Sequence, residues 1–369
     1  MFIVTALTIV LICKNWFQIY LPSAPKIIKP KNNKADRIIW CFIATIIWFS
    51  FPLVHGLAQD RSDTLRVSTR TSYIEDMDRS LNFKLSFSNE LETFTVKATP
   101  TPIKLYPNSK SNLSLHFAYR FVYLVLGFAP DFLPGNSDQN IKGDTKQFVF
   151  GSGIVLKRWY GHFNYKNVEG YYLQNTKDFD SNWDKGDPYI QFPNLNYEGL
   201  TLKGGYLFNP KYSILNVTTQ TERQILSAGS LIPAIDFRYY VIDDKSSSPS
   251  SQRSTNQEIR LSLGYFYTWV ARPFLFVSGG LAPGIGYQDV ELLTRTPSGD
   301  FLTTQNNTIY FLTGRAAVGH NGAKFYYGGW IDFSRSTNKQ ENTTVSNNDN
   351  QNYYQLYIGI RINSKTKSK

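Results

Sequence analysis

Apolar residues alternate with polar or small residues in one segment after another of this chain, from residue 81 onward. In residues 81–88, LNFKLSFS, the apolar side chains fall on every second position, and residues 354–363, YQLYIGIRIN, repeat the pattern. Neighbouring side chains on a β-strand point to opposite faces, so this period of two predicts strands with one apolar face. The segments are about ten residues long and turn residues separate them, which is typical of transmembrane β-barrels.

The pattern predicts an all-β protein, an antiparallel transmembrane β-barrel of about 12 strands (10–14) that occupies residues 81–363 as one domain. Inside a bilayer every backbone N–H and C=O group must be hydrogen-bonded, so the sheet has to close on itself. The alternative is a soluble β-sandwich or a lipocalin-like barrel, whose apolar face points inward. Many positions on the polar face are Gly, Ser, Thr, Asn or charged, which favours a small hydrated lumen and therefore the membrane barrel.

A leader-like segment precedes the barrel at residues 31–58. Basic residues open it, an apolar stretch over residues 38–54 follows, and Gly56 and Ala58 occupy the small positions of a cleavage site. This order predicts a helical signal peptide that is cleaved between Ala58 and Gln59. The alternative is a membrane anchor, since the apolar stretch is close to the shortest length, about 17 residues, that spans a bilayer.

The segments around the leader and the barrel are interpreted from their composition. Residues 1–30 are interpreted as a mis-extended start, although the apolar run at residues 1–13 would also suit the first helix of a membrane hairpin. Residues 59–80 are polar and weakly patterned, which predicts a periplasmic extension, and residues 364–369 form a polar tail.

Charge and cysteine usage agree with export. Residues 1–58 carry six Lys or Arg and one acidic residue, so the remaining chain has a net charge of +6 rather than +11. A nucleic-acid interface needs a clustered basic face, and the remaining sequence has none, so no nucleic-acid partner is expected. Both cysteines, Cys13 and Cys41, precede the cleavage site, so the exported chain would have no disulfide. The expected location is the outer membrane of a Gram-negative bacterium, with outer-membrane lipid and the barrel assembly machinery as partners.

Two polar stretches, residues 178–187 and 337–352, are predicted to be long external loops. Asp178, Asp180 and Asn182 have the spacing of a calcium-binding loop. However, the sixth position is not glycine, and Tyr189 stands where a bidentate glutamate is expected. A solvated loop is therefore favoured, and no metal or cofactor is expected.

Five polar residues are predicted to face the lumen, namely His116, Arg120, Lys157, Glu222 and Arg361. Residues 197–220 read as a hairpin that turns at residues 209–211. Glu222 and Arg223 follow it and would point to opposite faces of a regular strand. Glu222 would therefore join a lumenal charge cluster with Arg120, Lys157 or Arg361, or the stretch would lie beyond the bilayer at a strand end. The second interpretation is favoured.

His116 shares its strand face with Ser114, two residues before it. A Ser–His pair suggests a hydrolase, but any polar barrel lumen contains such pairs, so catalysis is not expected. Adjacent aromatic residues near strand ends, such as Trp159–Tyr160 and Tyr326–Tyr327, suit the aromatic girdles of a membrane barrel.

Five stretches carry a family resemblance, namely residues 72–88, 106–121, 142–172, 192–200 and 216–233. They resemble a family of outer-membrane proteins of Bacteroidota, domain-of-unknown-function family 4421. The resemblance implies a β-barrel behind a signal peptide, and it implies no established activity and no catalytic residues. The segment before the leader lies outside the family pattern, which favours a mis-extended start.

These features together predict an integral outer-membrane β-barrel with a structural, binding or narrow-pore role. Two alternatives stay open. One is a barrel enzyme that acts on lipid or peptide at the outer membrane. The other is a passive diffusion porin, provided that neither side chains nor the N-terminal extension fill the lumen.

Overall fold

The computed structural model describes residues 72–77, 79–89, 92–96, 101–246, 251–338, 345–346 and 351–363. The predicted leader, its cleavage site at Ala58 and Gln59, and the tail at residues 364–369 lie outside the described residues. So does the greater part of the predicted extension at residues 59–80.

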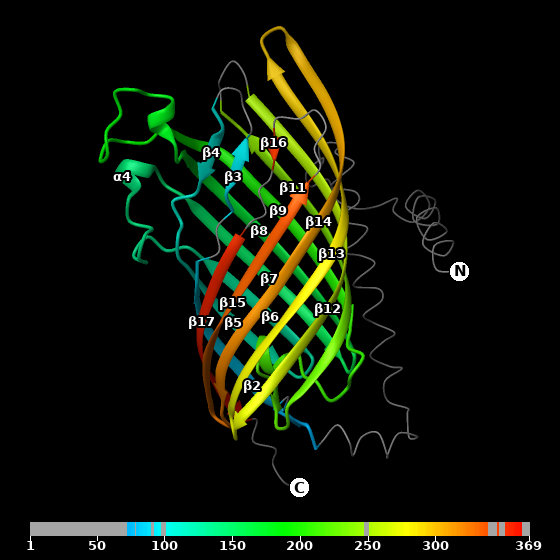
Figure 1. The fold of residues 1–369 in the computed structure, drawn as a ribbon. Helices are drawn as coiled ribbons and strands as arrows, with labels where there is room; N and C mark the ends of the chain where they lie inside the picture. Colours follow the sequence, from blue (N-terminus) through cyan, green and yellow to red (C-terminus); the bar gives the residue numbers. More distant parts are fainter. Residues whose placement is uncertain are drawn as a thin grey trace, which may run out of the picture. The chain divides into compact units, whose positions relative to one another are not determined.

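Twelve of the described strands form one closed ring (Figure 1). They are β2 (Ser80–Ser88), β5 (Asn112–Tyr119), β6 (Val122–Phe128), β7 (Lys146–Leu156), β8 (Trp159–Leu173), β9 (Gln191–Tyr206), β11 (Ala228–Asp244), β12 (Ser251–Arg272), β13 (Leu275–Thr296), β14 (Gly299–Asn321), β15 (Phe325–Asn338) and β17 (Gln351–Asn363). Each strand pairs antiparallel with the next one in this order, and β17 closes the ring by pairing with β2, with Ile358 opposite Leu85. The prediction of an antiparallel β-barrel of about 12 strands is confirmed.

The outer face of the barrel is apolar and the inner face is polar. On β12, Leu261, Leu263 and Trp269 are exposed on the outside, whereas Glu258 and Arg260 are buried inside. The exposed apolar side chains of β12 cover residues 259–269. A tilted strand needs about 9–11 residues to cross a bilayer, so this belt has the length of a membrane span.

The two ends of the barrel differ. At one end the strands are joined by tight turns at residues 120–121, 157–158, 273–274 and 322–324. At the other end β13 and β14 join through a two-residue turn, but the remaining connections are longer, and two of them contain the short helices α4 (Gln139–Lys142) and η1 (Thr176–Asp178). The paired strands β13 and β14 also rise above the rest of the barrel there, at the top of Figure 1. None of the helices in the described part of the chain is long and apolar enough to cross a membrane.

Inward-facing aromatic rings cover glycines on the neighbouring strands. The directly opposed pairs are Tyr123–Gly153, Tyr160–Gly205, Phe266–Gly280, Phe276–Gly319, Phe311–Gly284 and Tyr326–Gly359. A Cβ atom at any of these glycines would lie 2.2–2.8 Å from an atom of the opposed ring. Each glycine therefore makes room for a ring that fills part of the lumen, a device that also supports sheet curvature.

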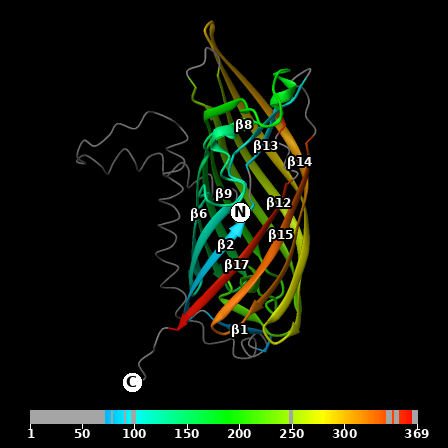
Figure 2. The same cartoon turned by 90° about the vertical axis from the view of Figure 1, so that its left-hand side faces the viewer.

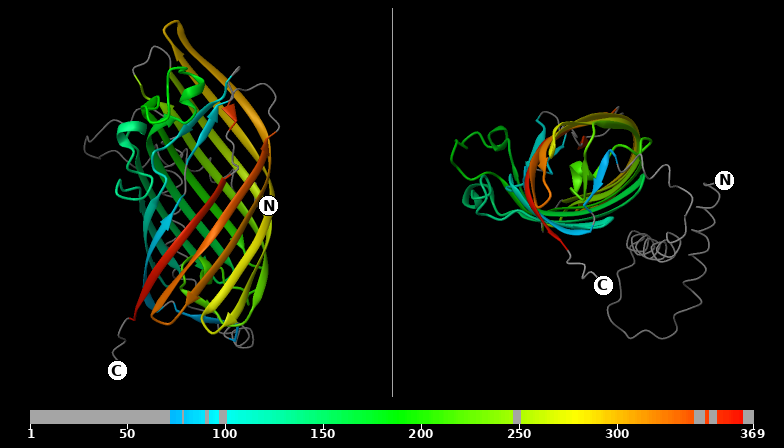
Figure 3. Two further views of the ribbon diagram at one scale, coloured as in Figure 1. Left: turned by 60° about the vertical axis from the view of Figure 1, so that its left-hand side comes forward. Right: turned by 90° about the horizontal axis from the view of Figure 1, so that it is seen from below.

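Residues 207–227, here called the plug, join β9 to β11 but fold into the lumen instead of making a tight turn. The plug contains helix α5 (Leu215–Thr218) and strand β10 (Glu222–Gln224), and β10 pairs with β1 (Ile74–Asp76). Seen from below in Figure 3, a helix of the plug's colour lies inside the ring of strands.

The predicted hairpin over residues 197–220 is therefore wrong, because β9 pairs with β11 instead. The residues after the expected turn are mostly polar on both faces. As a ring strand they would point polar side chains at lipid, whereas inside the lumen they find hydrogen-bond partners.

A second segment enters the barrel from the end with the long connections. It contains β3 (Phe94–Val96) and β4 (Ile103–Tyr106) from the connection between β2 and β5, and β3 also pairs with β16 (Val345–Ser346). Phe94 packs against Tyr171 and Tyr197, with ring centroids 5.5 and 5.7 Å away. Figure 1 labels β3, β4 and β16, and Figure 2 shows β2 and β17 side by side where the ring closes.

Candidate functional site

The plug crosses the lumen from one wall to the opposite one. It starts between β9 and β11, yet its far end contacts β2, β14 and β17, which lie on the other side of the ring. Val217 of the plug packs in a buried cluster with Phe276, Tyr326, Trp330 and Tyr357 of the far wall. The barrel is therefore filled at its short-turn end by its own chain.

Lys84 on β2 holds the far end of the plug. Its ammonium Nζ donates hydrogen bonds to the carbonyl oxygen of Thr218 at 2.5 Å and to Oε1 of Gln220 at 3.2 Å. The same ammonium lies over the rings of Trp330 and Tyr357, 5.4 and 5.1 Å from their centroids. Carbonyl dipoles and π-faces together replace part of the water that a buried cation loses.

Arg361 on β17 holds the same end of the plug. Its guanidinium donates to the backbone oxygens of Gln220 and Gly322 and to the side-chain oxygen of Asn321. It also lies over the ring of Tyr326, with Cζ 4.6 Å from the centroid. One side chain therefore joins the plug, the β14–β15 turn and the last strand of the barrel.

Glu222 lies inside the plug rather than on the barrel wall. Its carboxylate accepts a hydrogen bond of 2.6 Å from the hydroxyl of Ser213, and its backbone oxygen accepts one from Asn321. Asn321 also donates to the side-chain oxygen of Asn216, which in turn accepts from the backbone N–H of Gln224. These buried polar groups satisfy one another, which explains how a polar segment can fill a barrel.

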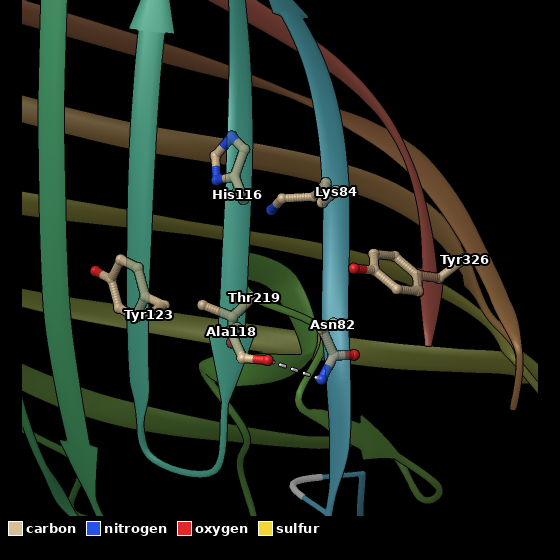
Figure 4. A pocket seen from close by; sticks show the side chains of 7 residues that line it. All are labelled: Asn82, Lys84, His116, Ala118, Tyr123, Thr219 and Tyr326. Atoms are coloured by element: carbon tan, nitrogen blue, oxygen red, sulfur yellow. Dashed lines mark hydrogen bonds between the residues drawn. The ribbon is translucent and has the colours of Figure 1, made fainter. Parts of the chain in front are cut away.

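His116 pairs with Ser86 of the neighbouring strand. The Ser86 hydroxyl and His116 Nε2 are 2.6 Å apart, and the hydroxyl lies 3.4 Å from the backbone oxygen of Ser114. Lys84 and His116 stand side by side on β2 and β5 in Figure 4, at the edge of a void that Thr219 of the plug also lines. The void measures about 10 Å³, which is close to the least space that one water needs.

A larger hollow, here called the central cavity, lies farther from the short turns and has a volume of about 270 Å³. Its lining comes from β8, β9, β11, β12, β14 and β15 and from the connection after β2. The lining residues are Glu92, Asn164, Lys166, Tyr197, Gly199, Thr201, Lys203, Asp236, Arg238, Arg260, Ser262, Phe311, Thr313 and Ser334.

Ion pairs order the charged wall of the central cavity. Lys166 lies 3.2 Å from Glu92, and Lys203 lies 3.2 Å from Asp236. The side chain of Lys203 is 40% exposed, so solvent reaches this wall. The ring of Phe311 and the hydroxyl groups of Thr201, Ser262, Thr313 and Ser334 also line the cavity. The cavity lining therefore combines charged, aromatic and hydroxyl groups.

Two of the residues predicted to face the lumen lie elsewhere. Arg120 and Lys157 are exposed in the tight turns after β5 and β7, with φ of 53° and 52°. A two-residue turn between antiparallel strands demands positive φ, which glycine and asparagine usually supply. The apolar–polar alternation that predicted inward-facing side chains ends at Tyr119 in β5 and at Leu156 in β7, one residue before each turn. The prediction that Arg120 and Lys157 face the lumen is therefore wrong.

The other three predicted residues come close together but do not form a single charge cluster. His116 and Arg361 are on the wall, and Glu222 is in the plug. Asn321 connects Arg361 with the backbone of Glu222, and Lys84 lies between His116 and the plug.

Sequence reasoning missed Lys84, Ser86 and Asn321. Lys84 and Ser86 occupy polar positions of the alternating run LNFKLSFS. The alternation therefore already indicated that both side chains face the lumen. No sequence pattern marks Asn321 as important, because its role is to form hydrogen bonds with the plug, and the sequence did not predict the plug.

The adjacent aromatic residues near strand ends do not all lie on the outer face of the barrel. Adjacent strand residues point to opposite faces, so only one member of a pair can reach the membrane interface. Tyr327 is exposed on the outside, whereas its neighbour Tyr326 is fully buried in the lumen. Tyr171 and Tyr172 are both buried, beneath the connections at the long-loop end.

The loop that resembles a calcium site is held by protein contacts. Lys177 donates to the backbone oxygens of Ser181 and Trp183 and pairs with Asp184 at 3.3 Å. Asp180 accepts from the backbone N–H of Asn182. Across the described ranges, no group of three or more His, Cys, Asp or Glu side chains is placed to hold a metal ion.

These features define the class, which is a closed twelve-stranded antiparallel β-barrel with an apolar outer face and a lumen plugged by its own chain. Within that class the chain belongs to the family described as domain of unknown function DUF4421, whose profile matches residues 61–361. The predicted membership of domain-of-unknown-function family 4421 is thereby confirmed. No curated protein matches the sequence significantly.

Several solved structures resemble the barrel weakly. The beta domain of the Bordetella autotransporter BrkA has a TM-score of 0.36 and 9% identity, over 76% of this chain and 98% of that one. The outer membrane protease OmpT from Escherichia coli has a TM-score of 0.35 and 8% identity, and the match covers 78% of this chain and 98% of that one.

The ferric yersiniabactin uptake receptor FyuA from Yersinia pestis has a TM-score of 0.26 and 12% identity. The match covers 76% of this chain but 43% of the receptor, so the chain spans less than half of that protein's length.

Proposed function

We propose that this protein is an outer-membrane barrel that binds a small polar solute in its lumen and does not act as an open diffusion pore. The observation that carries the proposal is the plug. It crosses the lumen and is fastened to the far wall by Lys84 and Arg361. A buried polar segment that fills the channel would block diffusion through an open pore. In a barrel that binds a solute, the same segment closes the lumen beneath the binding cavity.

The outer-membrane location and the partners belong to the same proposal. The apolar outer belt supports contact with membrane lipid, and we propose that the barrel assembly machinery inserts the barrel. Bacterial barrels carry short turns on the periplasmic side, so we place the plug at the periplasmic end. From the resembling stretches we also infer an origin in Bacteroidota.

Single-channel recording in planar lipid bilayers tests the closed lumen. The intact protein is expected to show no sustained conductance. A variant in which a short Gly–Ser linker replaces residues 210–226 is expected to conduct, since twelve strands without a plug leave a lumen between those of filled eight-stranded barrels and open porins. An equivalent replacement of residues 179–187, an exposed loop, serves as the matched control and is expected to stay silent.

Open-pore conductance of the intact protein would contradict the proposal and favour the diffusion porin. Membrane fractionation tests the location separately. We expect a band in the outer-membrane fraction whose gel mobility shifts on boiling, whereas a soluble periplasmic protein would refute the membrane assignment.

The Ser86–His116 contact is better explained as a structural pair than as a hydrolase centre. The adjoining void of about 10 Å³ admits neither a lipid nor a peptide. The charged group beside His116 is the ammonium of Lys84, whereas a catalytic triad places a carboxylate there. Hydrolysis of lipid or peptide by the purified barrel that disappears in His116→Ala would overturn this interpretation.

A further inference from the structure

Two arginines of the central cavity share one buried carboxylate. Oε2 of Glu258 accepts from Arg238 Nη1 at 3.3 Å and lies 2.8 Å from Arg260 Nη2. Glu258 itself is only 2% exposed. The three side chains project inward from the adjacent strands β11 and β12, with Arg238 directly opposite Glu258.

The other oxygen of the Glu258 carboxylate accepts hydrogen bonds from side chains that do not line the cavity. Oε1 of Glu258 accepts hydrogen bonds from the hydroxyl of Tyr240 at 3.2 Å and from Nε2 of Gln288 at 3.0 Å. Gln288 donates as well to the Tyr240 hydroxyl and accepts from Asn307. A carboxylate fixed at both oxygens holds its partners in defined positions, so the two guanidiniums are preorganised.

The arginines also rest on aromatic rings. Cζ of Arg260 lies 5.4 Å from the ring centroid of Phe311, and Cζ of Arg238 lies 5.5 Å from that of Tyr240. Both arginines line the central cavity, whereas Glu258 does not. The shared carboxylate is therefore a support behind the cavity wall, and the cavity itself meets the cationic groups.

Among the described residues that line the cavity, cations outnumber anions. Lys166, Lys203, Arg238 and Arg260 line the cavity, against the carboxylates of Glu92 and Asp236. Even with Glu258 included, the group has an excess of one positive charge. An anion that enters a partly desolvated pocket of this kind gains more from these charges than it would in water.

We propose that the central cavity binds a small molecule through a carboxylate or phosphate group, which lies against Arg238 and Arg260 with Lys203 at its side. The inference rests on the proposed function as a solute-binding barrel and adds the chemical class of the solute. A volume of about 270 Å³ suits a small metabolite rather than a polymer. The ring of Phe311 faces the apolar part of such a molecule.

Calorimetric titration of the purified full-length protein in detergent tests the proposal. Inorganic phosphate and citrate serve as the two anionic probes, which separates phosphate from carboxylate recognition, and glucose serves as the neutral probe. At least one anion is expected to bind more tightly than glucose. The paired substitutions Arg238→Gln and Arg260→Gln are expected to weaken that binding by at least about tenfold, since each removes a charge-assisted contact.

Three further variants keep the test decisive. Because the paired substitutions leave Glu258 buried without its partners, a triple variant that adds Glu258→Gln restores neutrality and should also fail to bind. Lys203→Gln alters a half-exposed side chain and is expected to weaken anion binding while the barrel stays folded. Arg295→Gln is the matched control, because Arg295 pairs with Asp243 at 3.0 Å and does not line the cavity.

The outcomes separate this inference from the proposed function. An intact protein that does not conduct and binds neither anion would overturn the inference alone. Anion binding that survives in the triple variant and in Lys203→Gln would also overturn it. Open-pore conductance of the intact protein would instead contradict the proposed function, whatever the titration shows.

Discussion

At the scale of single residues, buried cations fasten the plug to the wall. Lys84 and Arg361 stand on neighbouring strands and both reach Gln220, which is fully buried in the lumen. Amide oxygens accept hydrogen bonds from both cations, and aromatic rings lie against both. Such contacts are directional, so each cation fixes a position of the plug as well as contributing free energy.

Arg361→Gln is expected to lower the free energy of unfolding by about 3 kcal/mol, because it leaves buried carbonyl oxygens without their charged donor. Urea unfolding in lipid vesicles, followed by tryptophan fluorescence, would measure this difference. Arg335→Gln is the matched control, since Arg335 bonds to Asn352 on the exposed side of the barrel, and its effect should stay within about 0.5 kcal/mol. Equal effects of the two substitutions would show that Arg361 does not fasten the plug.

At the scale of elements, neighbouring strands fit by placing a ring over a glycine. Tyr326 on β15 stands opposite Gly359 on β17, and its hydroxyl donates to the backbone oxygen of Phe83 at 3.0 Å. The ring cannot move without breaking that contact or leaving the cluster around Val217 of the plug. Strand pairing and plug packing are therefore coupled at this ring.

Gly359→Ala tests this coupling. Its Cβ would lie 2.2 Å from ring atoms of Tyr326, so the ring must shift, and we expect a loss of about 1–3 kcal/mol of unfolding free energy. Gly161→Ala is the control, because its nearest neighbour, a methyl group of Ile154, lies 3.6 Å away. The same unfolding assay should find the control unchanged, and a tolerated Gly359→Ala would show that the ring is free to move.

At the scale of the whole molecule, the described barrel has an apolar outer surface and a polar surface around its lumen. The apolar belt surrounds the ring of strands, but β13 and β14 continue past it as a hairpin with both faces exposed near residues 301–304. Apolar side chains on that hairpin therefore stand outside the belt, even though their exposure is similar. Position along the strand, rather than exposure, decides which of them meets lipid.

Leu263→Arg should cost about 2–4 kcal/mol of unfolding free energy in lipid vesicles, because it places a charge on the lipid face near the bilayer centre. Phe301→Arg changes a side chain of similar exposure, 59% against 50%, on the hairpin and should be nearly neutral. Unfolding measured for both variants in the same vesicles gives the comparison. A larger loss of unfolding free energy for Phe301→Arg than for Leu263→Arg would show that the membrane belt does not lie at residues 259–269 of β12.

The sequence by itself determined the strands, their two faces and the closure of the sheet. In residues 81–88 and 354–363 the face of each residue follows from its parity along the strand, which is a local property. An apolar face that meets lipid then demands a closed ring, because no backbone group can stay unpaired there. The inward position of Lys84 follows from the same rule.

Only the tertiary structure decided what fills the lumen. Nothing within residues 207–227 predicts a plug, because several of its buried polar groups are satisfied by Lys84, Asn321 and Arg361, which lie far away in the sequence. The two arginines of the central cavity likewise become a site only when β11 and β12 bring them to one carboxylate. An odd or even position along a strand determines which face of the sheet a side chain occupies. Its hydrogen-bond partners across the closed barrel depend instead on the order of the strands and on their register, and the local sequence pattern contains neither.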